Sequence, residues 1–261
     1  MTSYTVRVFR TGHMRGLPGP EVYWMSDWGE KYPADFLAVV VQGGGRTAVI
    51  NTGPPADMLD EMNVHWRRFH GDDTVMHVEK GEHVIDQLRA AGVAPESVDF
   101  VIATPFQNYA TGNLDLFPNA QICLSRRGWV ELLAPRWRPH PHDVPRYCFP
   151  PRILAWLVTE AWDRVRLLDD EEMLLPGLET FWVGCHHRSS IAVKIQTAKG
   201  AVIATDTCFK YGNVERPHPL GISENLYECL AAYERIRREA AIVVPLYDPD
   251  VFVRHPGGAV A

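Results

Sequence analysis

The chain has 261 residues, of which 46% are hydrophobic and 22% are charged, and its formal net charge is −6. This length and composition predict one globular domain over residues 1–261, and the acidic balance, with a pI near 6.0, argues against nucleic acid or an anionic membrane as partner. A small-molecule substrate fits better. The first ten residues alternate between apolar and polar, unlike a signal peptide, and no apolar run reaches about 18 residues, so we expect a cytoplasmic protein.

The first half of the chain predicts a β-hairpin, a helix and a further strand. Strand signals cover residues 5–10, 36–42 and 47–51, with three glycines at 43–45 forming the turn. Residues 79–92 place apolar side chains at helical spacing and end at a glycine, which predicts an amphipathic helix. A strand over residues 98–103 follows.

The second half repeats this plan. Strands are expected at residues 121–125, 178–183, 190–197, 200–205 and 240–245, and helices at 127–133 and 223–239. Residues 134–162 are rich in proline, arginine and tryptophan and interrupt the plan, so we expect an inserted helical, proline-rich cap. The pattern predicts a mixed α/β (α+β) protein with two sheets and outer helices.

The five cysteines are an odd number without CxxC spacing, which argues against a disulfide framework and against a zinc ribbon. We expect buried free thiols. They are Cys123, Cys148, Cys185, Cys208 and Cys229.

Several short segments occur in an order that is typical of one superfamily. They are residues 50–53 (INTG), 97–104 (SVDFVIAT), 112–120 (GNLDLFPNA), 183–190 (VGCHHRSS), 204–207 (ATDT) and 244–249 (VPLYDP). Together they resemble the metallo-β-lactamase superfamily and, within it, the N-acyl homoserine lactonase-like hydrolases. The resemblance covers most of the chain and implies a four-layer αββα sandwich.

The resemblance also implies where metal ligands would stand. The family's HxHxDH positions are occupied by Pro105, Gln107, Tyr109 and Ala110, and Tyr247 stands where the last ligand histidine would be. A third-ligand histidine, His186, and a bridging carboxylate, Asp206, remain. A catalytic zinc needs about three protein donors, so the sequence predicts no bound metal and no other cofactor.

The remaining polar residues suggest an altered site. His186 is the candidate base, and Asp206 either orients it or caps the next segment. Tyr109 and Tyr247 either donate hydrogen bonds to a substrate oxygen or only fill the space that the metals left. These four are the predicted catalytic residues.

Four further residues are predicted to bind substrate: Gln107, Asn108, His187 and Trp28. The two amides either recognise polar groups or satisfy loop backbone. Trp28, with Trp24, Trp137 and Trp156, lines a pocket, forms a dimer contact or packs the cap.

Two other groups of histidines are expected to be unrelated to the site. Residues 138–143 (RPHPHD) imitate a ligand motif, but we interpret them as a proline-rich surface loop. A solvated face is predicted for four histidines that are irregularly spaced among charged residues. They are His65, His70, His77 and His83.

The leading functional hypothesis is a metal-independent hydrolase or lyase of a small lactone, an activated ester or another carbonyl substrate. One alternative is a non-catalytic ligand-binding protein, or the partner subunit of an active paralogue. Another is a rebuilt single-metal site from His186, Asp206 and a neighbour such as Cys185, His187 or Tyr247. We also expect a homodimer, and convergence of Asn51, Gln107, Tyr109, His186, Asp206 and Tyr247 at one edge of the sheets.

Overall fold

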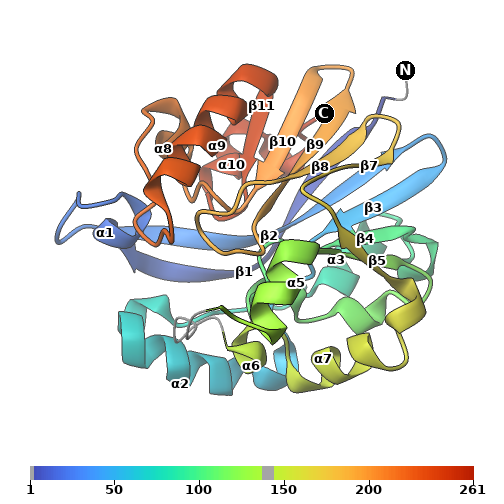
Figure 1. The fold of residues 1–261 in the computed structure, drawn as a ribbon, viewed down its shortest axis with the longest axis horizontal. Coiled ribbons are helices and arrows are strands. Elements are labelled where there is room, and N and C mark those ends of the chain that lie inside the picture. The colour runs from blue at the N-terminus through green and yellow to red at the C-terminus, as the bar shows by residue number, and fades with distance from the viewer. Residues whose placement is uncertain (1–2, 137–143) are drawn as a thin grey trace.

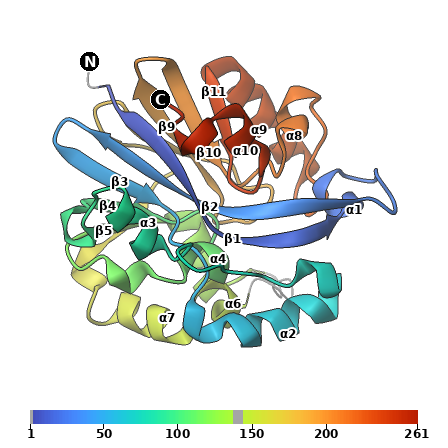
Figure 2. The same ribbon diagram turned by 180° about the vertical axis from the view of Figure 1, so that it is seen from behind.

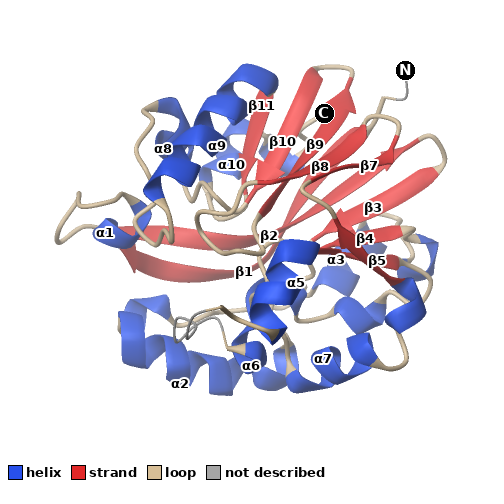
Figure 3. Ribbon diagram, in the orientation of Figure 1, coloured by secondary structure: helices blue, strands red, loops and turns tan. Residues whose placement is uncertain are grey.

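The computed structural model describes residues 3–136 and 144–261. Two β-sheets lie face to face, and helices cover both outer sides (Figures 1 and 3). The first sheet has the order β1-β2-β3-β4-β5-β6 and the second has the order β11-β10-β9-β8-β7. The predicted four-layer αββα sandwich is confirmed.

The strands keep the predicted order. The first sheet consists of β1 (Thr5–Pro18), β2 (Lys31–Gly43), β3 (Arg46–Ile50), β4 (Phe100–Ile102), β5 (Gln121–Ser125) and β6 (Val165–Leu168). The second consists of β7 (Glu171–Leu175), β8 (Leu178–Trp182), β9 (Ile191–Thr197), β10 (Gly200–Thr205) and β11 (Ile242–Pro245). Strands β6 and β7 were not predicted from the sequence.

The helices are short except for two. They are α1 (Gly19–Val22), α2 (Leu59–His70), α3 (Val84–Ala90), α4 (Asn108–Thr111), α5 (Arg126–Leu133), α6 (Pro145–Cys148), α7 (Pro151–Val158), α8 (Tyr211–Glu215), α9 (Leu226–Glu239) and α10 (Asp250–Arg254). Asn51 and Thr104 follow two parallel strands, β3 and β4, and Asp206 and Tyr247 follow another parallel pair, β10 and β11. Because parallel strands run in the same direction, the residues that follow them emerge at one edge of a sheet.

Strands β1 and β2 are longer than predicted and project from the body as an arm that carries α1 (Figures 1 and 2). Their pairing continues to Pro18 and Lys31, with register shifts between Arg10 and Gly12 and again beyond Met14. Such irregularities break the strict alternation of side chains, so the sequence pattern of β1 fades after Arg10 although the strand continues.

The hydrophobic core has three parts. Side chains such as Ile50 and Val193 fill the space between the two sheets. Leu88 of α3 and Ile153 of α7 pack in a cluster on the first sheet's helical side. A third cluster lies beneath the arm and includes Tyr233 of α9.

All five cysteines are buried and free, as predicted. Part of the expected cap, residues 137–143, lies outside the described residues, and with it the RPHPHD motif and Trp137. The insertion over 134–162 therefore stays a prediction. In the described ranges, no helix has both the length and the apolar character needed to cross a bilayer.

Helix α2 corrects one interpretation. Residues 65–83 were expected to present histidines to solvent, but His65 is buried and its ring stacks on Tyr147 with 3.8 Å between ring centroids. The His70 side chain is only 9% exposed. The prediction was based on the charged residues around these histidines in the sequence. It was wrong for His65 and His70, because an imidazole ring can pack against other aromatic rings in the interior.

Candidate functional site

The structure brings the six expected residues to one edge of the two sheets. The Asn51 side chain donates to the Thr104 carbonyl at 2.8 Å, and the Thr104 backbone N–H donates back to Asn51 Oδ1 at 2.9 Å. The Thr104 hydroxyl then donates to Asp206 Oδ1 at 2.5 Å. The other residues, Gln107, Tyr109, His186 and Tyr247, line one cavity beside this chain of hydrogen bonds.

Asp206 is fully buried and holds three segments together. One carboxylate oxygen accepts from Thr104, and the other accepts from the Ser190 hydroxyl at 2.5 Å. Burial raises the pKa of Asp206, while these two hydroxyl donors act in the opposite direction. Each carboxylate oxygen accepts from a hydroxyl, so Asp206 has a structural role, and its orienting contact with His186 stays a prediction.

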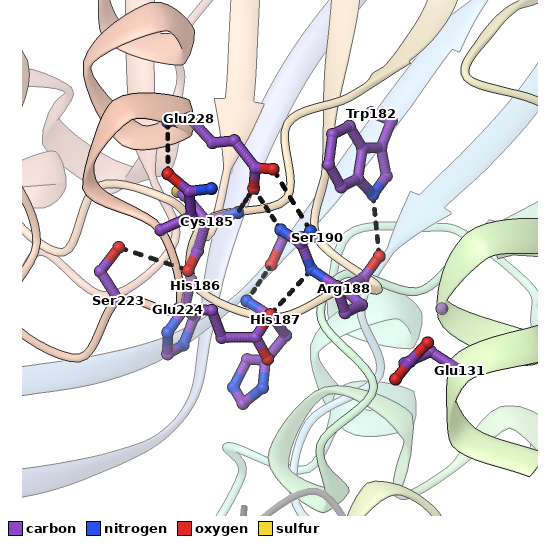
Figure 4. A network of polar contacts seen from close by, with 12 residues as sticks. Glu131, Trp182, Cys185, His186, His187, Arg188, Ser190, Ser223, Glu224 and Glu228 are labelled. Atoms are coloured by element: carbon purple, nitrogen blue, oxygen red, sulfur yellow. Dashed lines mark hydrogen bonds and ion pairs between the residues drawn. The ribbon is translucent and has the colours of Figure 1, made fainter. Parts of the chain in front are cut away.

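His186 is held instead by a backbone carbonyl. Its Nδ1 lies 3.0 Å from the carbonyl oxygen of Ile222. A carbonyl can only accept a hydrogen bond, so Nδ1 carries the proton and Nε2 is the basic nitrogen of the neutral ring. The His187 ring lies beside it, with centroids 4.0 Å apart, and both rings point to the same side of their loop (Figure 4).

The loop that carries both histidines is anchored by Arg188. Its Nε lies 2.8 Å from Glu224 Oε2, and its terminal nitrogens pair with Glu228 of α9 (Figure 4). The Trp182 ring lies 4.8 Å from the guanidinium carbon, and the Trp182 indole N–H donates to the Arg188 carbonyl. These contacts tie residues 183–190 to α9 and to the end of β8, so the histidine rings are held from both sides.

Two tyrosines stand among aromatic rings in the place of charged ligands. The Tyr109 ring stacks on Phe36 with centroids 4.8 Å apart, and it meets Tyr247 edge-on at 5.8 Å. Burial, and then the neighbouring Tyr109 and Asp206, raise the pKa of Tyr247 well above its ordinary value, so its hydroxyl keeps the proton and remains a donor. The Tyr247 hydroxyl forms no well-aligned hydrogen bond within the described part of the chain.

The cavity between these groups is narrow and mostly apolar. The empty volume of the cavity is about 500 Å³ and includes the space that opens to solvent. Its apolar walls come from the arm and from the loops, and include Met14, Leu17, Ala34, Phe36, Phe209 and Ile222.

The predicted substrate-binding residues separate into two groups. Gln107 and His187 line the cavity. Asn108 does not, because its side chain is buried and donates to the Arg146 carbonyl. Trp28 is 70% exposed on the arm and lies outside the cavity wall, so the structure does not bring it to the other site residues.

Two cavity residues were missed in the sequence. Trp66 and His70 of α2 both line the cavity. His70 Nδ1 lies 2.6 Å from Glu21 Oε1 of α1, a contact between residues 49 positions apart. No short-range pattern in the sequence joins these two residues.

The donor set does not fit the metal centre that the resemblance implies. Pro105 and Ala110 supply no side-chain donor, and both oxygens of Asp206 accept from buried hydroxyls. The contact of His186 Nδ1 with a carbonyl leaves Nε2 as a possible ligand, but one histidine nitrogen is too few for a metal centre. Over residues 3–136 and 144–261, no three His, Cys, Asp or Glu side chains are grouped to hold a metal ion. A rebuilt single-metal site from His186, Asp206 and a neighbour is not supported by this arrangement.

Comparison with known proteins agrees with the architecture. No protein-family model matches the chain. The chain is 21% identical over 229 residues to the N-acyl homoserine lactonase AttM of Rhizobium radiobacter, covering 84% of this chain and 83% of that protein.

Solved structures show the same fold at lower identity. One is an N-acyl homoserine lactone hydrolase with the product N-hexanoyl-L-homoserine bound at its catalytic metal centre, with a TM-score of 0.78, 15% identity and 97% of each chain covered. Another is B. thuringiensis AiiA with N-decanoyl-L-homoserine bound, with a TM-score of 0.77, 15% identity and again 97% of each chain covered.

Proposed function

We propose that the chain is a lactonase-like hydrolase of the metallo-β-lactamase superfamily and that it hydrolyses a small lactone or activated ester without a metal. The observation that carries the proposal is the convergence of His186, Tyr109 and Tyr247, from three separate segments, on one cavity. Among the positions where the resemblance implies metal ligands, three have hydrogen-bonding side chains that line this cavity: Gln107, Tyr109 and Tyr247.

The chemistry follows from the geometry of these side chains. His186 Nε2 accepts a proton from a water molecule as the water oxygen attacks the substrate carbonyl carbon. The hydroxyl of Tyr247, with Tyr109 beside it, donates to the oxygen on which negative charge develops. The ester C–O bond then breaks, and the leaving oxygen takes up a proton.

The rate factors expected from these side chains limit the class of substrate that the site can hydrolyse. A positioned general base contributes about 10²- to 10⁴-fold, and one oxyanion donor contributes about 10²- to 10³-fold. These factors are smaller than the combined effects of a metal that both activates water and polarises a carbonyl. Strained lactones and esters with good leaving groups are therefore the expected substrates, and plain amides are not.

The test compares wild type with His186→Ala on a panel of γ-lactones and aryl esters. We expect the variant to lose about 10²- to 10⁴-fold in kcat/KM while its circular dichroism spectrum stays unchanged. His255→Ala, at the end of α10 and outside the cavity wall, is the control and should keep full activity. Full turnover by His186→Ala would remove the proposed base.

A second candidate function is ligand binding without catalysis. The apolar wall and the stacked Phe36 and Tyr109 rings favour it, because an apolar, aromatic lining is typical of sites that hold a small molecule. It predicts saturable calorimetric binding of a lactone with no product over hours. Co-purification with a paralogous subunit would support a partner role.

A further inference from the structure

One buried lysine joins three segments of the chain next to the cavity. The Lys210 side chain is 9% exposed, and its Nζ donates to the Pro33 carbonyl oxygen of β2. Nζ also lies 3.4 Å from Asp248 Oδ1, and the Asp248 side chain is 5% exposed. Lys210 precedes α8 and Asp248 follows β11, so the three groups come from segments that are far apart in the chain.

Each of these three residues stands next to a residue that lines the cavity. The neighbours in the chain are Ala34, Phe209 and Tyr247. Lys210 and Asp248 themselves line a separate polar pocket. The Lys210 nitrogen therefore links three walls of the cavity from outside it, one residue away from each wall.

Two of the linked segments also hold the Tyr247 ring. Phe209 meets this ring edge-on with centroids 4.8 Å apart, and Phe36 of β2 meets it edge-on at 6.3 Å. The position of the Tyr247 hydroxyl therefore depends on how closely β2 and the segment before α8 approach the segment after β11.

Backbone hydrogen bonds join β2 to the same segment. The Asp35 N–H donates to the Tyr247 carbonyl at 3.2 Å, and the Leu37 N–H donates to the Leu246 carbonyl at 3.3 Å. These two amide protons are exchangeable with solvent only when the contact opens, so their exchange rates report on it.

The groups that Lys210 joins are fixed by further contacts. Asp248 Oδ2 accepts from the Tyr211 N–H at 2.8 Å, and its Oδ1 accepts from the Asp250 N–H at 3.2 Å. The buried Asn213 side chain accepts from the Lys210 backbone N–H at 2.9 Å. Since the backbone is held at both ends, the bonds of Nζ to Pro33 and Asp248 set the distance between the arm and the segment after β11.

We propose that Lys210 is a positioning residue that holds Tyr247 in place by joining Pro33 of the arm to Asp248. Without the nitrogen, a buried carbonyl and a buried carboxylate would each lose a donor, and the segments that carry them would separate more easily. The effect of Lys210 on turnover rests on the proposed function. Its effect on the contact between β2 and residues 246–248 does not.

Lys210→Met tests the proposal without a substrate, because it removes the nitrogen and keeps an unbranched side chain. We expect the Asp35 and Leu37 amides to exchange about 10- to 100-fold faster in hydrogen-exchange NMR, since the contact that protects them is weakened. The amides that pair β9 with β10 report general loss of stability, and the change is measured relative to them.

Lys194→Met is the matched control. The Lys194 side chain is 19% exposed, and its Nζ lies 3.0 Å from Glu239 Oε2, so this variant also removes a shielded lysine contact. It joins β9 to α9 and should change the exchange of the Asp35 and Leu37 amides by less than about twofold relative to the reference amides.

Turnover provides the second measurement. On a lactone or activated ester that the wild type hydrolyses, we expect Lys210→Met to lower kcat about 10- to 100-fold and to change KM by less than about threefold. The reason is that Tyr247 acts on charge that develops only in the transition state. A purely structural role for Lys210 would lower the fraction of folded enzyme and leave kcat per folded molecule unchanged.

Asp248→Asn serves as a second variant, which decides the matter if Lys210→Met does not fold. It keeps one oxygen for the Tyr211 N–H and weakens the contact with Nζ. We expect the Asp35 and Leu37 amides to exchange faster here as well. Where both single variants fold, the double variant should add no more than about twofold to the larger single effect, because the two side chains act as one unit.

Each outcome decides the inference. Faster exchange of the two amides together with lower kcat, and no change in Lys194→Met, supports the assignment. Unchanged exchange overturns it whatever the activity, and faster exchange with unchanged kcat overturns the positioning of Tyr247 for the reaction. A wild type that hydrolyses no member of the panel removes the proposed function, and the exchange rates alone then decide whether Lys210 holds this contact.

Discussion

Asp206, which stands where the resemblance implies a bridging carboxylate, has a structural role together with Thr104 and Ser190. The two hydroxyls donate to the two oxygens of one fully buried carboxylate. Removing that carboxylate would leave the buried Ser190 hydroxyl without its acceptor, at a cost of about 1–3 kcal/mol, whereas the Thr104 hydroxyl also lies 3.0 Å from the Ile191 carbonyl oxygen. At this scale Asp206 stabilises the edge of the two sheets, and His186 depends on Ile222 for its orientation.

Asp35 supplies a pH-dependent prediction. Burial raises the pKa of Asp35 from 3.8 to about 6, although Arg10 and Lys210 act to lower it. The folded-state pKa of Asp35 lies above the unfolded value, so protonated Asp35 contributes fully to the free energy of unfolding below pH 3.8. This contribution is lost as the pH rises through about 6, because the buried carboxyl then ionises. We expect Asp35→Asn to raise the melting temperature relative to wild type above that pH.

The measurement is thermal unfolding of wild type and Asp35→Asn across the acidic and neutral range. The advantage of the variant should shrink toward zero as the pH approaches 3.8. Asp86→Asn, an exposed change on α3, controls for the removal of one negative charge. An advantage of Asp35→Asn that is constant with pH would contradict the effect of burial on this carboxyl.

At the scale of elements, residues 183–190 carry the proposed base and are joined to α9 by Arg188. The guanidinium lies between Glu224 and Glu228 with about a third of each of the three side chains exposed. The attraction between Arg188 and the two carboxylates is less screened by water than that of a surface ion pair. The cost of removing these charges from water is also smaller than for a fully buried ion pair. Its main effect is to hold the histidine loop in place.

We therefore expect Arg188→Met to destabilise the protein by about 1–3 kcal/mol, because two partly buried carboxylates lose their common partner. Urea unfolding measures this change, and kcat for a substrate of the wild type should fall as well, since His186 lies two residues away. Arg126→Met is the matched control, because the Arg126–Asp169 pair is 53% and 71% exposed and should contribute at most about 1 kcal/mol. Equal effects of the two variants would argue against an anchoring role.

At the scale of the whole molecule, the sandwich places the residues that follow β3, β4, β10 and β11 at one edge, whatever the chemistry of those residues. The convergence of these residues is therefore a property of the fold. The arm formed by β1 and β2 adds walls to the cavity and also presents Trp24, Met25 and Trp28 to solvent. The homodimer stays a prediction, which light scattering at micromolar concentration tests.

The altered donor set predicts that metal does not stabilise the fold. We expect elemental analysis of protein grown in excess zinc to give less than about 0.1 metal per chain, because no three possible ligands are grouped in the described parts of the chain. A chelator should leave the melting temperature unchanged, since only a ligand that binds the native state would raise it. A chelator-sensitive melting curve would contradict the metal-independent proposal and favour a single-metal centre.

The sequence alone predicted the two-sheet architecture, and the loss of a metal centre stays a prediction. Strand runs such as residues 36–42 and 200–205 carry their own signal in alternation and turn residues, and the order of the family-like segments supplied the topology. The absence of a donor at Pro105 or Ala110 is a property of the residue type, so it needed no coordinates.

Only the tertiary structure decided which side chains meet. Helix α2 was not predicted, because its buried face is partly made of His65 and His70 among charged residues. The partners of Asp206, the exposure of Trp28 and the contact of His70 with Glu21 depend on how the arm, α2 and the loops pack against one another. Local sequence patterns describe periodicity and propensity within one segment. These contacts join segments that are far apart in the chain, so they can be identified only once the segments are packed against one another.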